Sequence, residues 1–223
     1  MAQPPTKKLK TSMTEFHIPK DLLQSEVSQL PLLLDTESQT IKLPREDPDV
    51  FVLFATWLTR GSIELCFEFI NLDNLNVSPT QDTKAAAALK TQRLDQWHQL
   101  VNAYILGDLL GSVAFKNTVM DLLVDKAQVV AKENKMAAEM QHRSLSLIYD
   151  STEAGSPLRR LAVQMGLNHL NLNDLPAGIA CAFWAELAKS AVPLFRISES
   201  GHDVSTGPWA LTMDKSLFHE KHC

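Results

Sequence analysis

The side chains best suited to chemistry in this chain are seven histidines and three cysteines, and they are scattered along 223 residues. The nearest approach to a cluster is FHEKHC at 218–223, which carries His219, His222 and Cys223. Imidazole and thiolate groups are the usual ligands of zinc. However, this stretch ends a polar segment that we interpret as a tail, and a tail does not hold ligands in a fixed geometry. We therefore predict no metal site.

The cysteines also give no indication of reactive chemistry. Cys66, Cys181 and Cys223 are odd in number and far apart, which is typical of free thiols in a reducing compartment. Cys66 stands between two apolar residues, so we expect a buried, inert thiol and not a nucleophile. His17 alternates with apolar neighbours, which predicts a histidine on the surface of a short strand.

The sequence contains none of the short motifs that mark common catalytic or nucleotide-binding sites: CxxC, HExxH, GxSxG, Walker A or GxGxxG. Only eight glycines are present, which argues against glycine-rich phosphate loops. A net charge of −5 gives no support for nucleic-acid binding. We therefore expect a protein that is not an enzyme, with no catalytic residues, no cofactor and no nucleic-acid partner.

The N-terminus is polar and rich in proline and lysine, unlike a signal peptide. No apolar run approaches the length of about 20 residues that a membrane-spanning helix needs. We expect an intracellular protein, in the cytoplasm or the nucleus, that does not contact a membrane. The stretch KKLK at 7–10 could act as a nuclear-import signal, although a solvated basic tail is the simpler interpretation.

Two adjacent arginines raise a separate question. In GSPLRRLA at 155–162, Ser156 can cap a helix that begins at Pro157, which puts Arg159 and Arg160 in the first turn. Cations are disfavoured there by the helix dipole. Either both arginines are simply solvated, or at least one pairs with carboxylates or with free carbonyl oxygens at the end of an earlier helix. We favour the second alternative, a structural clamp that docks the C-terminal helices onto the preceding part of the chain, with Asp150 and Glu153 as nearby acidic candidates.

The elements that would position these residues begin with a helix at 47–61. Asp47 is a typical cap, Pro48 suits the first helical position, and Gly61 ends the helix. Its apolar residues share one face and include the candidate core or interaction residues Phe54 and Trp57. A second apolar stripe at 97–109 includes the candidates Trp97 and Tyr104.

Other patterns complete the predicted order of elements. Strands are expected at 14–18, 39–44 and 62–65, and helices at 19–30, around 115–123, from Pro157 and from Pro176. Residues 71–83 are predicted to form a surface loop, and 144–150 is a short, mostly apolar segment. A few short strands followed by helices to the end predict a helix-dominated α+β protein.

Four segments in this order resemble BTB/POZ domains. They are FHIPKDLL (16–23), IKLPREDPDVFVLFATWLTRGSI (41–63), LVNAYILGDLLGSVAFKNTVMDLL (100–123) and YDSTEAGSPLRRLAVQM (149–165). The last is similar to a segment that follows the domain in many fungal members. The resemblance implies a tail at 1–13, a BTB/POZ-like domain at 14–130, a C-terminal helical extension at 131–195 and a polar tail at 196–223.

The resemblance also implies a function. BTB/POZ domains have a small sheet with a helical cluster and bind other proteins without catalysis. Some are substrate adaptors for cullin-type ubiquitin ligases, and others repress transcription. We therefore expect a protein–protein interaction module that could serve as a cullin adaptor. A nuclear transcriptional regulator, or an unrelated helical enzyme subunit, is the alternative.

One departure from the family concerns self-association. In BTB/POZ domains a strand, and often a helix, precede the segment similar to FHIPKDLL, and only 15 residues precede Phe16 here. An aromatic pair usual after the first helix is replaced by SEVSQLPLLL. We therefore expect a weakened homodimer, or a monomer, and weakened cullin binding.

Overall fold

A computed structural model describes residues 15–35, 40–41, 43, 47–63, 83–132, 142–169, 181–199 and 214–220. Within these residues the protein is a helix-dominated α+β fold with one small antiparallel sheet, as the sequence predicted. Strand β1 (Leu34–Asp35) pairs with β2 (Thr40–Ile41), with Leu34 opposite Ile41. The helices are α1 (Lys20–Glu26), α2 (Leu30–Leu33), α3 (Pro48–Arg60), α4 (Thr83–Leu110), α5 (Val113–Lys132), α7 (His142–Ser151), α8 (Pro157–His169), α9 (Cys181–Glu199) and the 3₁₀ helix η4 (Lys215–Phe218).

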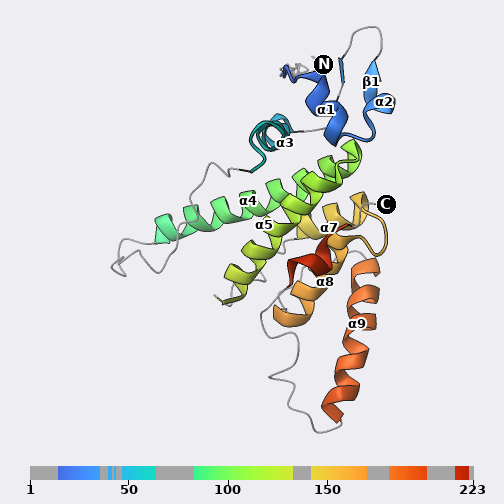
Figure 1. Cartoon of the computed structure of the whole chain (residues 1–223). Helices are drawn as coiled ribbons and strands as arrows, with labels where there is room; N and C mark the ends of the chain where they lie inside the picture. The colour runs from blue at the N-terminus through green and yellow to red at the C-terminus, as the bar shows by residue number, and fades with distance from the viewer. Residues whose placement is uncertain are drawn as a thin grey trace, which may run out of the picture.

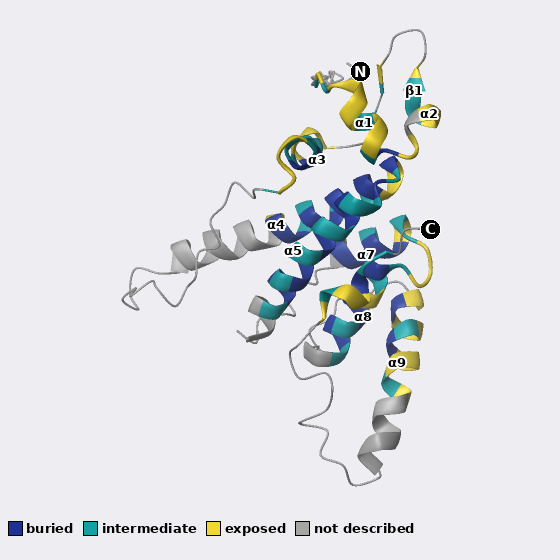
Figure 2. Cartoon of the chain, in the orientation of Figure 1, coloured by how far each residue is buried: buried dark blue, intermediate teal, exposed yellow. Residues whose placement is uncertain are grey.

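Helices α4 and α5 form a hairpin at the centre of the molecule (Figure 1). Helix α3 packs against α4 from one side, and α7 packs against α4 as well. Helix α8 joins α5, α7 and α9. Because α4 has neighbours on several sides, its buried residues are not confined to one stripe: Ala103, Leu106 and Leu110 are buried beside the predicted stripe, whereas Leu109 is exposed. Figure 2 shows the buried residues concentrated on α4, α5, α7 and α8.

The turn between α4 and α5 depends on a glycine. Gly111 has a φ of 66°, a left-handed conformation that favours glycine. The turn at Ser28 and Gln29 lies directly against it: the Ser28 hydroxyl donates to the Gly111 carbonyl at 2.8 Å, and the Gln29 N–H donates to the Leu110 carbonyl at 3.2 Å. These bonds fix the N-terminal part of the chain to the central hairpin.

Helix α3 follows the local signals of the sequence closely. The Asp47 side chain accepts from the Asp49 N–H at 3.0 Å, Pro48 opens the helix, and Gly61 closes it with a φ of 71°. The buried face of α3 includes the rings of Phe54 and Trp57. Both rings contact Phe115 of α5, at centroid distances of 5.1 and 5.2 Å, so the two helices are joined through aromatic side chains.

The predicted strands are mostly wrong. Residues 15–18 form no strand; instead, Phe16 packs on Phe51 of α3 with the ring centroids 4.8 Å apart. Of the strand expected at 39–44, residues 40–41 form β2, residue 43 is not in a strand, and the other positions lie outside the described residues. Residues 62–63 are not in a strand. A β-strand is stable only when a neighbouring strand can pair with it. Residues 15–18 have no such pairing and are held instead by the contact of Phe16 with a ring of α3. Helix α1 also ends at Glu26, earlier than position 30.

The C-terminal half is more helical than predicted. The apolar segment 144–150 lies within α7, where Leu145, Ile148 and Tyr149 are buried. Helix α8 begins at Pro157, as predicted, and α9 continues to Glu199, past the predicted limit of 195. Helix α9 extends alongside α8 with one face outward (Figure 2). Several predictions lie outside the described residues: the tail 1–13 with KKLK, the strand at 64–65, Cys66, the loop 71–82, the helix start at Pro176, His222 and Cys223.

The predicted polar tail at 196–223 is wrong for residues 214–220. These residues, which we call the C-terminal segment, pack on α5 and α8 through η4. Phe218 is 6% exposed and belongs to the hydrophobic core. The prediction was wrong because it rested on the polar composition of the whole region, whereas one apolar side chain, that of Phe218, is enough to anchor the segment. None of the described helices combines the length and the apolar character that crossing a bilayer requires.

Candidate functional site

Three of the aromatic candidates from the sequence are core residues. Phe54, Trp57 and Trp97 are at most 8% exposed and belong to one continuous hydrophobic core. They therefore stabilise the fold and offer no surface to a partner. Tyr104 is also buried, but its hydroxyl reaches a polar site, and both arginines belong to polar sites as well.

Arg159 joins α7 to α8. Its guanidinium donates to the Tyr149 carbonyl at 2.8 Å, to the Thr152 carbonyl, and to the Thr152 hydroxyl at 3.2 Å. These acceptors lie at the end of α7, where helix carbonyls lack partners within the helix. The guanidinium also lies over the Tyr149 ring, 4.6 Å from its centroid, a cation–π geometry. The predicted pairing of this arginine with free carbonyl oxygens at the end of an earlier helix is present. Both helices belong to the predicted extension at 131–195, however, so this contact does not dock the extension onto residues 14–130 as predicted.

Glu186 brings α9 into the same site. Its carboxylate accepts a hydrogen bond from the Tyr149 hydroxyl at 2.8 Å and forms an ion pair with Arg159 at 3.6 Å. Burial of Tyr149, followed by its hydrogen bond to the Glu186 carboxylate, raises the pKa of the hydroxyl. The acidic partner of Arg159 is therefore Glu186, which is distant in the sequence, and not the nearby Asp150 or Glu153 that the sequence suggested.

Arg160 serves a different contact, although it is adjacent. It is exposed, and it donates to the Gly155 carbonyl at 2.8 Å and to the Leu217 carbonyl at 3.1 Å. The Leu217 contact ties α8 to the C-terminal segment. Ser156 caps the helix as predicted, accepting from the Arg159 N–H at 3.3 Å. Both arginines thus oppose the helix dipole locally and are satisfied by carbonyl oxygens.

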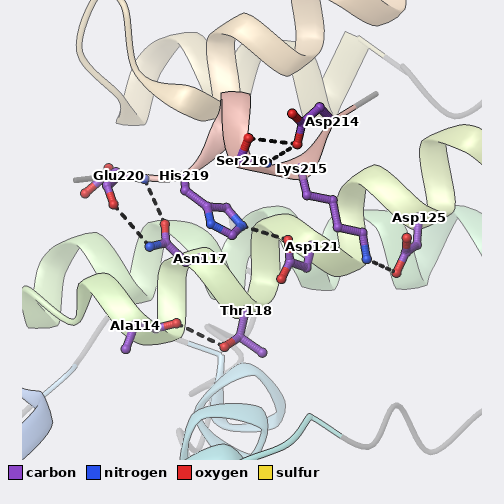
Figure 3. Close-up of polar contacts among 10 residues, drawn as sticks. All are labelled: Ala114, Asn117, Thr118, Asp121, Asp125, Asp214, Lys215, Ser216, His219 and Glu220. Atoms are coloured by element: carbon purple, nitrogen blue, oxygen red, sulfur yellow. Dashed lines mark hydrogen bonds and ion pairs between the residues drawn. The ribbon is translucent and has the colours of Figure 1, made fainter. Parts of the chain in front are cut away.

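The second site is the surface of α5 beneath the C-terminal segment. Asn117, Asp121 and Asp125 are spaced four residues apart on α5, so they form one row. We call this row, with Lys116 and the position where Phe218 is buried, the α5 face. Figure 3 shows Lys215 and His219 of the C-terminal segment directed at this row. The Lys215 ammonium lies 2.7 Å from the Asp125 carboxylate, and the His219 Nε2 lies 2.7 Å from that of Asp121.

Asn117 recognises backbone and not side chain. Its amide nitrogen donates to the Glu220 carbonyl at 3.2 Å, and its amide oxygen accepts from the Glu220 N–H at 2.8 Å (Figure 3). A side-chain amide that pairs with both polar groups of one residue holds an extended stretch of chain in a fixed register. This contact is independent of which side chain occupies position 220.

The Glu220 carboxylate reaches beneath the surface. It accepts from the Tyr104 hydroxyl at 2.9 Å and pairs with the Lys116 ammonium at 2.5 Å. Lys116 also pairs with Asp108 at 2.7 Å, and its side chain is only 6% exposed. Burial, and then the Glu220 carboxylate, raise the pKa of Tyr104. Burial alone would lower the pKa of Lys116, but its hydrogen bonds to Asp108 and Glu220 outweigh this and raise it.

The C-terminal segment is also organised internally. The Asp214 carboxylate accepts from the Ser216 hydroxyl at 2.7 Å and from the Ser216 N–H at 3.0 Å, which caps η4. These bonds lower the pKa of Asp214. The turn that presents Phe218 to the core is therefore held by a contact within the segment itself.

Most residues of this site were not predicted from the sequence: Lys116, Asn117, Asp121, Asp125 and Glu220 were not among the candidates. The spacing of the polar row on α5 and the apolar pair Leu217–Phe218 within a polar stretch were the available signals. His219, considered as a metal ligand, instead faces Asp121. Within the described part of the chain, no group of three or more histidine, cysteine or acidic side chains is placed to hold a metal ion.

Comparison with known proteins gave no match to a family model, to a curated protein or to a solved structure.

Proposed function

We propose that this chain is a non-enzymatic protein–protein interaction module. The observation that carries the proposal is the manner in which the α5 face holds the C-terminal segment. One buried aromatic anchor, a backbone-directed amide and a rim of exposed polar contacts are the elements by which proteins commonly bind short peptide segments. A surface that recognises a segment in this way is suited to binding another protein.

We further propose that the module is of BTB/POZ type. Support comes from the four sequence motifs, which coincide with α1, with α3, with the α4–α5 turn and with the junction of α7 and α8. On this proposal the protein acts inside the cell, in the cytoplasm or nucleus, and a cullin-type scaffold is one candidate partner. A monomer or a weak homodimer is the oligomeric state that accompanies it.

The test is a reconstituted complex. Proteins cross-linked to the chain in its native cells are identified by mass spectrometry, purified, and titrated against the full chain by calorimetry. A saturable complex of fixed stoichiometry supports the proposal. A purified cullin N-terminal region, titrated in the same way, tests the adaptor role separately. Turnover of a small-molecule substrate by the pure chain, without any stoichiometric protein complex, would contradict the proposal and favour an enzyme subunit.

A further inference from the structure

Within the proposed interaction function, on which this inference rests, the α5 face has a definable ligand. We infer that the α5 face is a docking site for a partner's peptide segment, and that the chain's own C-terminal segment occupies it in competition. The face selects the order cation, two residues, aromatic, base, acid, as in K-S-L-F-H-E at 215–220.

Charge complementarity sets this order. Asp125 and Asp121 present carboxylates to Lys215 and His219, and the buried Lys116 presents an ammonium to Glu220. The two signs therefore lie at opposite ends of the face, with the aromatic position between them. A segment bound in the reverse direction would place its acid against the carboxylates and its cation against the ammonium. The face thus specifies chain direction as well as composition.

Two of the ion-pair contacts that hold the docked segment are exposed and can exchange. The Lys215–Asp125 pair is 39% and 46% exposed on its two sides, and the His219–Asp121 pair is exposed to a similar degree. Exposed ion pairs of this kind contribute little net stability and are screened by salt. Phe218 is the one large apolar side chain of the C-terminal segment that is buried, since Leu217 is 66% exposed. Glu220 is different, because it pairs with the buried Lys116, so a segment that replaces the C-terminal segment must supply a carboxylate at this position.

The connection to the rest of the chain favours competition over exchange between two copies. Residues 200–213 join the segment to α9. A short tether gives a bound segment an effective concentration on the order of millimolar. A second copy at micromolar concentration cannot match this, whereas a partner segment with more complementary contacts can. The partner must therefore bind more tightly than the chain's own sequence does.

The experiment uses the full chain and a labelled synthetic peptide of residues 212–222, TMDKSLFHEKH, followed by fluorescence anisotropy. In the F218A chain the C-terminal segment loses its apolar anchor, and the face should bind the peptide at least ~10-fold more tightly than the wild-type chain does, because the tethered segment competes less effectively. A K215E chain, altered only at an exposed position, serves as a second receptor should F218A unfold. Equal affinities of wild type and both variants, or no saturable binding to a folded variant, would overturn the inference.

Charge reversal identifies the face. Adding D125K to the F218A chain should weaken the peptide several-fold, and a peptide carrying the K215E change should recover the loss. The matched control is D95K, an exposed aspartate of α4 outside the face, which should leave the affinity unchanged. A loss caused equally by D95K and D125K would show nonspecific electrostatics and refute the site.

Two further measurements separate the alternatives. A wild-type dimer in light scattering that F218A dissociates would assign the segment to a second copy and overturn the partner assignment. An identified partner that binds the F218A, K215E and D125K chains as it binds wild type would remove this docking site while leaving the interaction function in place.

Discussion

Replacing Arg159 by alanine should destabilise the fold more than any other single change at a polar residue of the α7–α8 junction. The side chain is 11% exposed and donates to two carbonyls and one hydroxyl at the end of α7. A hydrogen bond from a charged donor contributes about 1.5–3 kcal/mol. Two such bonds to carbonyls sum to about 3–6 kcal/mol, and water entering the vacated site offsets part of this. We expect a loss of about 3 kcal/mol in the free energy of unfolding.

The assay is urea unfolding of the full chain, followed by circular dichroism. Lysine at position 159 keeps the charge but not the planar fork, so R159K should recover less than half of the loss. The matched control is R160A. Arg160 is exposed and donates to the Gly155 carbonyl in a turn and to the Leu217 carbonyl in η4, so its removal should change stability by no more than about 1 kcal/mol.

A coupling measurement sharpens the test. Y149F removes the hydroxyl that donates to Glu186 but leaves the ring beneath the Arg159 guanidinium. The double variant R159A/Y149F should therefore lose less than the sum of the two single changes, because both act through Glu186. Equal stability of R159A and R160A, or strict additivity in the double variant, would refute the clamp as described.

Three further outcomes follow from the structure. Burial raises the pKa of Tyr104 and Tyr149, the only tyrosines of the chain, so both hold their protons more tightly in the folded state. The stability they contribute is complete below the ordinary tyrosine pKa of about 10 and is lost above it, so tyrosinate absorbance should rise together with unfolding and not before. G111A should destabilise the fold well beyond the ~1–2 kcal/mol expected of G61A: both glycines have positive φ, but a Cβ at Gly111 would lie 2.8 Å from a Gln29 carbon, whereas Gly61 faces open space. W57A should cost about 3–5 kcal/mol, because the buried indole packs on two phenylalanine rings, and wild-type thermal stability in this variant would contradict that packing.

The local sequence was sufficient to predict a helix where the residues at its ends specify its start or its end. Helix α3 begins and ends where Asp47, Pro48 and Gly61 predict, and α8 begins at Pro157 beneath the Ser156 cap. Such signals act within four residues, so no tertiary information is needed to interpret them. The clamp at Arg159 was also predictable in kind, because cations at a helix start need acceptors.

Local sequence was not sufficient where pairing depends on distant residues. The pattern at 14–18 predicted a strand, but Phe16 packs against Phe51 of helix α3 and does not pair with a neighbouring strand. The apolar segment 144–150 carries the spacing of a helix face at Leu145, Ile148 and Tyr149, but its short length left its type open.

The α5 face is the clearest case of a feature that only the tertiary structure decided. Glu220 meets Tyr104 and Lys116 across more than 100 residues of sequence, and Lys215 meets Asp125 across 90. The periodicity of the sequence cannot predict such a contact, because a short polar segment has the same composition whether it is exposed to solvent or packed on a helix. What distinguishes the two is the shape and charge of the surface it meets, and that surface exists only once α4, α5 and α8 have packed together.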